Sequence, residues 1–205
     1  MPRTKKITKL QGEDVSLKIK AIKLEGKLDN YDNYERRDTS VFSGTSLPVE
    51  ATSEDCKNIV VSVLQSKLKL IVSPQDISTA HRLNTKKAAS TKDIIVKFCR
   101  RDTKENIMKS CRTVKPTNLY VNEFLTPIRQ TIAYVLRRAK KECPEVISGS
   151  TTFEGKNIVW IKPARPNTPG AKNFKMVINT KERLDELCTK TLNKPLDFFI
   201  KKWDH

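Results

Sequence analysis

The chain has 205 residues with 40 Lys or Arg against 23 Asp or Glu, a net charge of +17 and an isoelectric point near 9.8. This excess of positive charge favours a polyanionic partner, and the length allows one or two compact domains. We expect no membrane span, no secretion signal and no zinc site, because no run of about 18 apolar residues occurs, no apolar segment follows the basic N-terminus, and the five cysteines never have Cys-x-x-Cys spacing.

Positive charge is concentrated in the two parts of the chain that have apolar periodicity. Residues 1–35 contain 8 basic and 6 acidic side chains, residues 36–122 contain 16 and 8, and residues 123–205 contain 16 and 9. A basic tail therefore does not explain the net charge, whereas an acidic ligand bound to folded surfaces does.

The first 35 residues divide into two predicted segments. Residues 1–14 are expected to form a disordered basic N-terminus, and residues 15–35 a short helix. Within the helix, five residues are spaced alternately four and three apart, namely Leu17, Ala21, Leu24, Leu28 and Tyr31. This spacing is typical of a coiled-coil seam, although two heptads are fewer than a stable coiled coil needs. Residues 15–31 are therefore a candidate for self-association, and the oligomeric state stays open.

Residues 36–122 have the pattern of one small domain. The predicted elements are a strand at 39–43, a helix at 52–68, strands at 76–83 and 93–99, a helix opened by a capping box at 102–105, and a strand at 119–122. This β-α-β-β-α-β order is the split plan of ferredoxin-like domains, the scaffold of the RNA-recognition motif. The expected fold class is α+β.

Residues 123–190 predict a second, small α/β domain, followed by a tail at 191–205. Thr126 and Pro127 are typical of a helix start, because threonine caps the helix and proline suits its first position. Further strands are expected near 146–148, 158–162 and 174–178, and Thr180 is expected to cap a final helix. A proline-rich loop at 163–170 separates the last two strands.

The candidate nucleic-acid-binding residues are cations next to predicted strand ends, on one predicted helix face and beside the 163–170 loop. Such side chains bind phosphates, and the alternative for each is a solvated surface charge or a salt bridge. The candidates are Arg36, Arg37, Arg82, Lys97, Arg100, Arg101, Arg137, Arg138, Lys140, Lys141, Arg165, Lys172 and Lys175. Phe98, Tyr120, Trp160 and the cysteines are expected in the cores, and the alternative for Phe98 and Tyr120 is to stack on nucleic-acid bases.

Catalytic motifs are missing from the sequence. It has no glycine-rich phosphate loop, no Gly-x-Ser-x-Gly elbow and no His-Glu-x-x-His helix, and its carboxylates stand isolated among basic residues. Only two histidines occur, His81 and His205. We therefore expect a protein that is not an enzyme and that uses no cofactor and no metal.

Five stretches of the chain resemble one known family, in the same order. They are IKLEGKLDNYDNYERRDTSVFSGTSLP (22–48), DISTAHRLN (76–84), DIIVKFCRRDTKENIM (93–108), LYVNEFLTPIRQ (119–130) and FKMVINTKERLDEL (174–187). Together they resemble the RNA-recognition motif and C-terminal domain of the first-reading-frame proteins of LINE-type retrotransposons. Baculovirus few-polyhedra (FP) proteins and their insect relatives share this layout.

The first resemblance implies a trimeric nucleic-acid chaperone that coats single-stranded RNA in a cytoplasmic ribonucleoprotein, with the nucleus as a second location. From the residues, we expect two basic domains joined near Asn122 and Glu123 to form a cleft whose cations contact phosphates with little sequence specificity. Single-stranded DNA is the other ligand left open. The resemblance to FP proteins implies an alternative, a structural or assembly protein that binds acidic protein partners.

Overall fold

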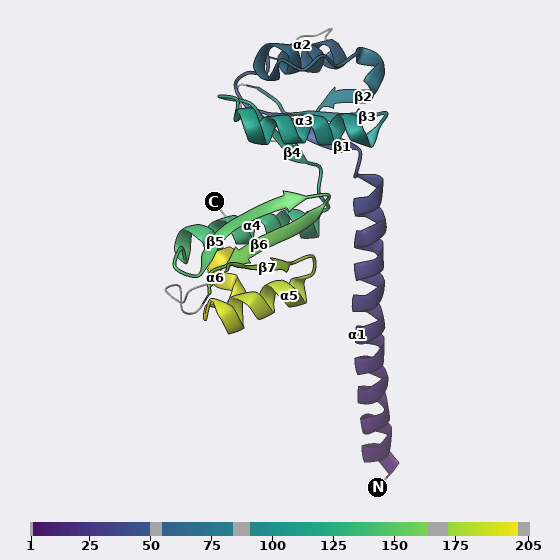
Figure 1. The fold of residues 1–205 in the computed structure, drawn as a ribbon. Helices are drawn as coiled ribbons and strands as arrows, with labels where there is room; N and C mark the ends of the chain where they lie inside the picture. Colours follow the sequence, from purple (N-terminus) through teal and green to yellow (C-terminus); the bar gives the residue numbers. More distant parts are fainter. Residues whose placement is uncertain (1, 50–54, 84–90, 164–171, 201–205) are drawn as a thin grey trace. The chain divides into compact units, whose positions relative to one another are not determined.

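The computed structural model describes residues 2–49, 55–83, 91–163 and 172–200 (Figure 1). The chain forms two compact units, which are described separately below. Unit 1 takes its described residues from 1–35, 126–150 and 159–205, and unit 2 takes them from 36–125 and 151–158. The architecture combines helices with β-sheets and is α+β, as expected.

Unit 2 contains a four-stranded sheet and two helices longer than three turns. Its elements in chain order are β1 (Thr39–Ser43), α2 (Cys56–Leu68), a 3₁₀ turn η1 (Pro74–Asp76), β2 (Ile77–Arg82), β3 (Ile94–Phe98), α3 (Arg101–Val114) and β4 (Tyr120–Glu123). The strand order is β2-β3-β1-β4, and each neighbouring pair is antiparallel. Residues 52–54, predicted as the start of the first helix, lie outside the described residues.

The core of unit 2 lies between the sheet and its helices. Phe42 and Phe98 on the strands are buried in one cluster with Leu64 of α2 and Ile107 of α3. In β3 the first, third and fifth residues are buried, while Lys97 between them is exposed. Because successive strand side chains point to opposite faces, one face of the sheet packs on the helices and the other does not.

The start of α3 differs from the predicted capping box at 102–105. The helix begins at Arg101, and its N-cap residue Arg100 makes no side-chain cap bond. The Glu105 carboxylate, which a capping box would turn back onto the N-cap backbone, instead pairs with Arg101 at 2.6 Å. An (i, i+4) ion pair has therefore replaced the predicted cap.

Unit 1 contains a long helix, a three-stranded sheet and several shorter helices. Its elements are α1 (Pro2–Glu35), α4 (Pro127–Glu142), β5 (Ile147–Phe153), β6 (Lys156–Ile161), β7 (Phe174–Val177), α5 (Lys181–Glu186), a π-helical turn η2 (Leu187–Thr191) and α6 (Leu196–Ile200). The strand order is β5-β6-β7, and the tip of β5 and β6, residues 151–158, belongs to unit 2. Ile132, Leu136, Ile147, Ile178 and Phe199 are among the buried core residues.

The predicted N-caps of two helices in unit 1 are confirmed. The hydroxyl of Thr126 accepts the backbone N–H of Arg129 at 3.4 Å, and Pro127 takes the first position of α4. The hydroxyl of Thr180 accepts the backbone N–H of Arg183 at 3.3 Å. Both threonines satisfy a backbone donor that the first turn of a helix leaves open.

Both ends of the chain differ from the expectation. Residues 2–14, expected to be disordered, form the first part of α1, where (i, i+4) ion pairs such as Asp14–Lys18 support the helix. Within the expected tail, 191–205, residues 196–200 form α6, because Phe199 is fully buried in the core of unit 1. No helix in the described part of the chain is long and apolar enough to cross a bilayer.

Candidate nucleic-acid interface

The sheet face of unit 2 that carries no helix is defined by the strand register. Residues directly opposite each other on neighbouring antiparallel strands lie on the same face. Lys97, for example, is opposite Thr39 of β1 and Thr79 of β2. We call the whole set the open face; it consists of Thr39, Val41, Ser43, Thr79, His81, Ile95, Lys97, Tyr120 and Asn122.

The open face is polar and cationic at its margins and apolar in the middle. Val41 and Ile95 lie opposite each other on the two central strands and are half-buried. His81, Asn122 and Tyr120 on the outer strands are exposed, and the tyrosine side chain keeps 61% of its surface accessible. None of the nine residues is acidic. This composition suits an anionic ligand that also offers flat apolar groups.

Cations gather at the end of the sheet where β1 begins and β3 ends. Because Thr39 is opposite Lys97, the residues just before β1 and just after β3 meet there. Five predicted site residues fall in this group, namely Arg36, Arg37, Lys97, Arg100 and Arg101. The structure therefore brings together this part of the predicted site.

The arginines that precede β1 are engaged by neighbouring groups of unit 2. The Arg36 guanidinium lies 4.4 Å from the ring centroid of Phe124 and donates a hydrogen bond to the carbonyl of Leu125 at 3.2 Å. Arg37 Nε lies 3.6 Å from an oxygen of Asp38, and both side chains are partly exposed. Arg36 thus fixes the segment that follows β4, while Arg37 keeps a weak surface ion pair.

Arg101 is held by two carboxylates. Its Nε lies 2.6 Å from Glu105 and an Nη 3.2 Å from Glu154, and the hydrogen bond to Glu105 is the main cause that raises the pKa of Arg101. Glu154 and Gly155 both have left-handed backbones, φ 51° and 69°, as a two-residue type I′ turn requires. The carboxylate of Glu123 accepts the N–H groups of both turn residues. Arg101 therefore stabilises this turn, a role that its sequence position did not indicate.

Lys97 and Arg100 differ from their neighbours. Both side chains are exposed, and neither has a hydrogen-bond or ion-pair partner among the described residues. Lys97 lies on the open face itself, and Arg100 follows β3 three residues later. Among the five predicted cations at this end of the sheet, these two could bind an anion without breaking a contact that the structure shows.

A buried lysine lies beneath this end of the sheet, and it is not among the predicted site residues. Lys104 of α3 is 5% exposed, and its Nζ donates a hydrogen bond to the carbonyl of Arg37 at 2.6 Å. Burial is the main cause that lowers the pKa of Lys104, and the nearby carboxylates of Glu123 and Asp38 oppose it. Lys104 therefore anchors the backbone that leads into β1.

Arg82 lies at the opposite end of the sheet from Arg100. It is opposite Ile94, the first residue of β3, and therefore belongs to the face that packs on the helices. Its guanidinium donates to the carbonyl oxygens of Pro48 and Lys92, both at 2.8 Å. Arg82, predicted as a phosphate contact next to a strand end, therefore does not lie on the open face, because a register shift between Ile77 and Thr79 reverses the alternation along β2.

In unit 1, three of the four predicted cations of α4 are exposed. Arg137, Lys140 and Lys141 have no partner among the described residues, and their three- and four-residue spacing places them on one helix face. Arg138 is half-buried, donates to the carbonyl of Phe199 at 3.1 Å and pairs with Glu142 at 3.8 Å. Arg138 therefore holds α6 rather than facing solvent.

The cations near β7 have open surroundings where the structure describes them. Lys172 and Lys175 are exposed, and neither has a partner among the described residues. Arg165 lies outside the described residues. Beside Lys175 on β7, the ring of Phe174 is 61% exposed.

The expected burial of aromatic and sulfur side chains is correct in part. Phe98 is 2% exposed in the core of unit 2, whereas Tyr120 is exposed on the open face. Cys99, expected in a core, is exposed at the end of β3. Burial raises the pKa of Cys111 and of Cys188 to about 11, so both thiols stay protonated at neutral pH.

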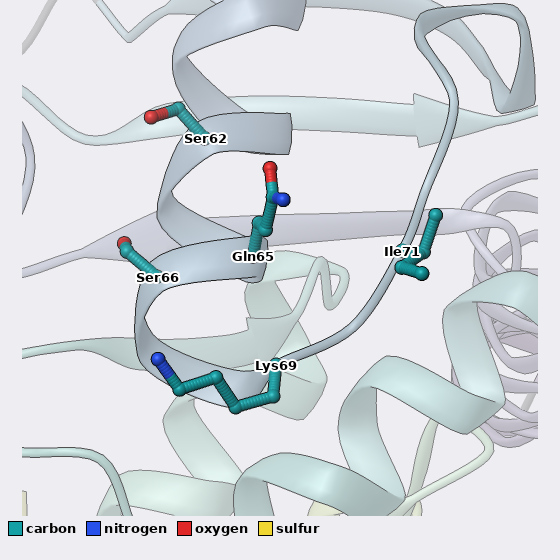
Figure 2. Close-up of a pocket in the computed structure, with 5 residues that line it drawn as sticks. All are labelled: Ser62, Gln65, Ser66, Lys69 and Ile71. Atoms are coloured by element: carbon teal, nitrogen blue, oxygen red, sulfur yellow. The ribbon is translucent and has the colours of Figure 1, made fainter.

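A shallow hollow of about 430 Å³ lies on α2, lined by Ser62, Gln65, Ser66, Lys69 and Ile71. Figure 2 shows α2 on one side of the hollow and the segment that carries Ile71 on the other. The helix residues in this lining are exposed, whereas the opposite face of α2 is buried in the core. The hollow therefore lies on the far side of unit 2 from the open face.

Comparisons with known proteins add no assignment. No protein-family model matches the chain, and no curated protein matches it. In the described ranges, no group of three or more His, Cys, Asp or Glu side chains is placed to hold a metal ion.

Proposed function

We propose that this chain binds single-stranded nucleic acid, with RNA as the main ligand, through phosphate contacts that carry little sequence information. The observation that carries the proposal is the open face of unit 2. It has no carboxylate, it has an exposed aromatic ring, and it includes Lys97, a cation with no partner among the described residues. Arg100, which follows β3, also has no partner among the described residues.

We further propose that unit 2 is a ferredoxin-like domain of the RNA-recognition-motif type. Two facts support this finer assignment: the element order β1-α2-β2-β3-α3-β4, and the central position of β1 and β3 in the sheet. In such modules single-stranded RNA lies across the sheet face that the helices leave free. The open face occupies that position in unit 2.

Unit 1 supports the same function with a separate cationic surface. Arg137, Lys140 and Lys141 form an exposed triad on α4, and Lys172 and Lys175 add two exposed charges near β7. Contacts to several phosphates from two units increase affinity without selecting a sequence. Many weak contacts that exchange also let bound strands rearrange, which is the physical basis of a nucleic-acid chaperone.

From the resemblance to LINE-type retrotransposon proteins, we further propose that this activity belongs to a cytoplasmic ribonucleoprotein and that copies of the chain associate through residues 15–31 of α1. The seam residues Leu17, Leu24, Leu28 and Tyr31 are 63%, 64%, 69% and 74% exposed. A single chain therefore leaves an apolar stripe of α1 in water, and a second copy would cover it.

A salt titration with a labelled single-stranded RNA tests the proposal. Each phosphate neutralised on a single strand contributes about 0.7 to the slope of log affinity against log salt, so six contacts cost roughly 300-fold between 50 and 200 mM salt. We expect Lys97→Ala with Arg100→Ala to lower that slope by about 1.4. The control, Lys67→Ala with Lys69→Ala, removes the same charge from α2 and its C-cap, away from the open face.

Binding that is weaker than micromolar and insensitive to salt would contradict the proposal. That result would favour the alternative, an assembly protein of the FP type whose basic faces bind acidic protein partners. A loss of affinity that is equal in the test variant and in the α2 control would show that only net charge matters and that the open face is not the site.

A further inference from the structure

We propose that Tyr120 stacks on one base of the bound strand and that Asn122 contacts the edge of the same base. The inference rests on the proposed function and assigns a base subsite to β4, at the edge of the open face. It adds a base contact to the expectation that the chain binds mainly through phosphates.

The exposure of Tyr120 follows from its neighbours. Its opposite residue on β1 is Ser43, whose small side chain does not cover a phenol ring. β4 is at the edge of the four-stranded sheet that the structure describes, so within this sheet the ring has a neighbouring strand on one side only. The helices pack on the other face, where Leu119 and Val121 contribute to the core. The ring of Tyr120 is therefore left 61% exposed.

The surroundings of the ring suit a nucleobase. Asn122 lies two residues further along β4 on the same face and is exposed. Its amide offers both a donor and an acceptor, which matches the edge of a base. Val41, opposite Asn122 on β1, is half-buried and gives an apolar floor beside the ring. A ring for stacking, an apolar surface beside it and an amide for hydrogen bonding thus lie on the same face of the sheet.

Tyr120 provides the stacking ring that the central strands lack. The middle of the open face has Val41 on β1 and Ile95 on β3, which are aliphatic. Tyr120 is the single Phe, Tyr or Trp among the nine residues of the open face. We therefore expect this face to stack one base rather than a series of bases.

The distance from Tyr120 to Lys97 is one that a short single-stranded nucleic acid can span. Tyr120 is opposite Ser43 at the end of β1, and Lys97 is opposite Thr39 at its beginning. Four strand residues separate these positions, or about 13 Å at 3.3 Å per residue. A nucleic-acid strand stacked on Tyr120 thus crosses the apolar centre, and its phosphates reach Lys97. The occupant is a nucleic acid, because every nucleotide has both a phosphate for the cations and a base for the ring, whereas the acidic side chains of a peptide have no aromatic face.

The test compares two ligands and three variants of the full chain. The ligands are a labelled single-stranded uridine octamer and an octamer of the same length whose ribose units carry no bases. The variants are Tyr120→Leu, Tyr120→Phe and, as a control in the same unit, Ile71→Ala, whose side chain is 96% exposed beside the hollow of Figure 2. Fluorescence anisotropy gives the dissociation constants, and thermal melting shows that each variant is folded.

We expect the wild type to bind the uridine octamer about 5- to 150-fold more tightly than the base-free octamer. Tyr120→Phe and Ile71→Ala should keep this ratio, and Tyr120→Leu should reduce it to near one without changing affinity for the base-free strand. Asn122→Ala should narrow the differences among octamers of the four bases.

Two results separate the failure of this inference from that of the proposed function. If the wild type binds both octamers equally, or if Tyr120→Leu keeps the full preference for the uridine octamer, the base subsite is wrong and phosphate binding stands. If the wild type binds neither octamer, single-strand binding itself is wrong, and the subsite is overturned with it.

Discussion

The guanidinium of Arg129 and the carboxylate of Asp29 form an ion pair in unit 1 with a distance of 2.7 Å between Nε and Oδ2. Their side chains are only 4% and 7% exposed, although the residues are 100 positions apart. The hydroxyl of Thr126 also donates to Asp29, and Asn30 accepts from Arg129 at 2.7 Å. This polar network joins the last turns of α1 to the first turn of α4.

Removing one partner of this pair is expected to destabilise unit 1. Arg129→Met leaves the carboxylate of Asp29 buried without its cation, which costs about 3–5 kcal/mol of unfolding free energy. Urea unfolding followed by the fluorescence of Trp160, in a Trp203→Phe background, measures the loss.

The matched control is a solvent-exposed ion pair with the same nitrogen–oxygen distance. Asp14 and Lys18 of α1 are also 2.7 Å apart, but their side chains are 60% and 70% exposed. Lys18→Met should therefore change stability by less than about 1 kcal/mol. Restoration of stability by adding Asp29→Leu to Arg129→Met would confirm that the unpaired charge, and not the lost contact, causes the loss. Equal effects of Arg129→Met and Lys18→Met would contradict this explanation.

Arg82 and Arg100 are expected to respond oppositely to substitution by alanine. Arg82→Ala removes two bonds to backbone carbonyls, at about 1.5–3 kcal/mol for each bond from a charged donor, so unit 2 should melt at a lower temperature. Arg100→Ala should change stability by less than about 0.5 kcal/mol and reduce the salt slope of RNA binding by about 0.7. Calorimetry of both variants measures the change in stability, and fluorescence anisotropy titrations at several salt concentrations measure the change in the salt slope. A stable Arg82→Ala protein that has lost RNA affinity would reverse the assignment.

The sequence predicts the buried face of a strand correctly only where core-facing and outward-facing residues alternate without interruption. In β3 the alternation of Ile94, Val96 and Phe98 predicts the buried face correctly. In β2 the register shift after Ile77 reverses the alternation, so the position of Arg82 in the sequence gave the wrong face. The carbonyl of Pro48 that Arg82 contacts lies 34 residues away, and no local pattern encodes such a contact.

The sequence contained a pattern that indicates the exposure of Tyr120, but the apolar character of its neighbours favoured burial. Leu119 and Val121 are two residues apart, so their side chains point to the same face, and both pack on the core. The side chain of Tyr120 between them therefore points to the opposite face. Three adjacent apolar residues instead indicated a buried strand. Whether a cation is free to bind phosphate depends on its burial and on its partners. Arg101 and Arg138 are arginines of the kind that bind phosphates, but each is held by a partner from a distant segment of the chain, which the local sequence does not reveal.

The seam of α1 is expected to mediate self-association. Leu24→Asp with Leu28→Asp removes two apolar side chains from the seam, each worth about 1.5–3 kcal/mol when buried, so association should weaken about 100-fold or more. Sedimentation at several concentrations measures the mass. Ile19→Asp with Ile22→Asp is the control, because these residues are 61% and 52% exposed but lie outside the seam. A wild type that stays monomeric at every concentration would refute self-association.

The stability that depends on Lys104 is expected to rise with pH in the alkaline range. Burial lowers its pKa in the folded state below the 10.5 of an exposed lysine. Between the folded and unfolded pKa values the unfolded chain therefore binds more protons, and the free energy of unfolding increases with pH. Below the folded pKa the cost of burying the charged amine is fully present. The gain begins only as pH rises through that value, and it is complete above 10.5.

Comparison with Lys104→Met isolates this contribution from the other lysines. The difference in unfolding free energy between wild type and Lys104→Met should grow from pH 7 to pH 10, because methionine does not titrate and leaves the carbonyl of Arg37 without its donor. Lys109→Met, which removes an exposed lysine of the same helix, is the matched control. A difference that shrinks as pH rises would mean that the charged amine is stabilised in the folded state, with the carboxylates of Glu123 and Asp38 outweighing the effect of burial.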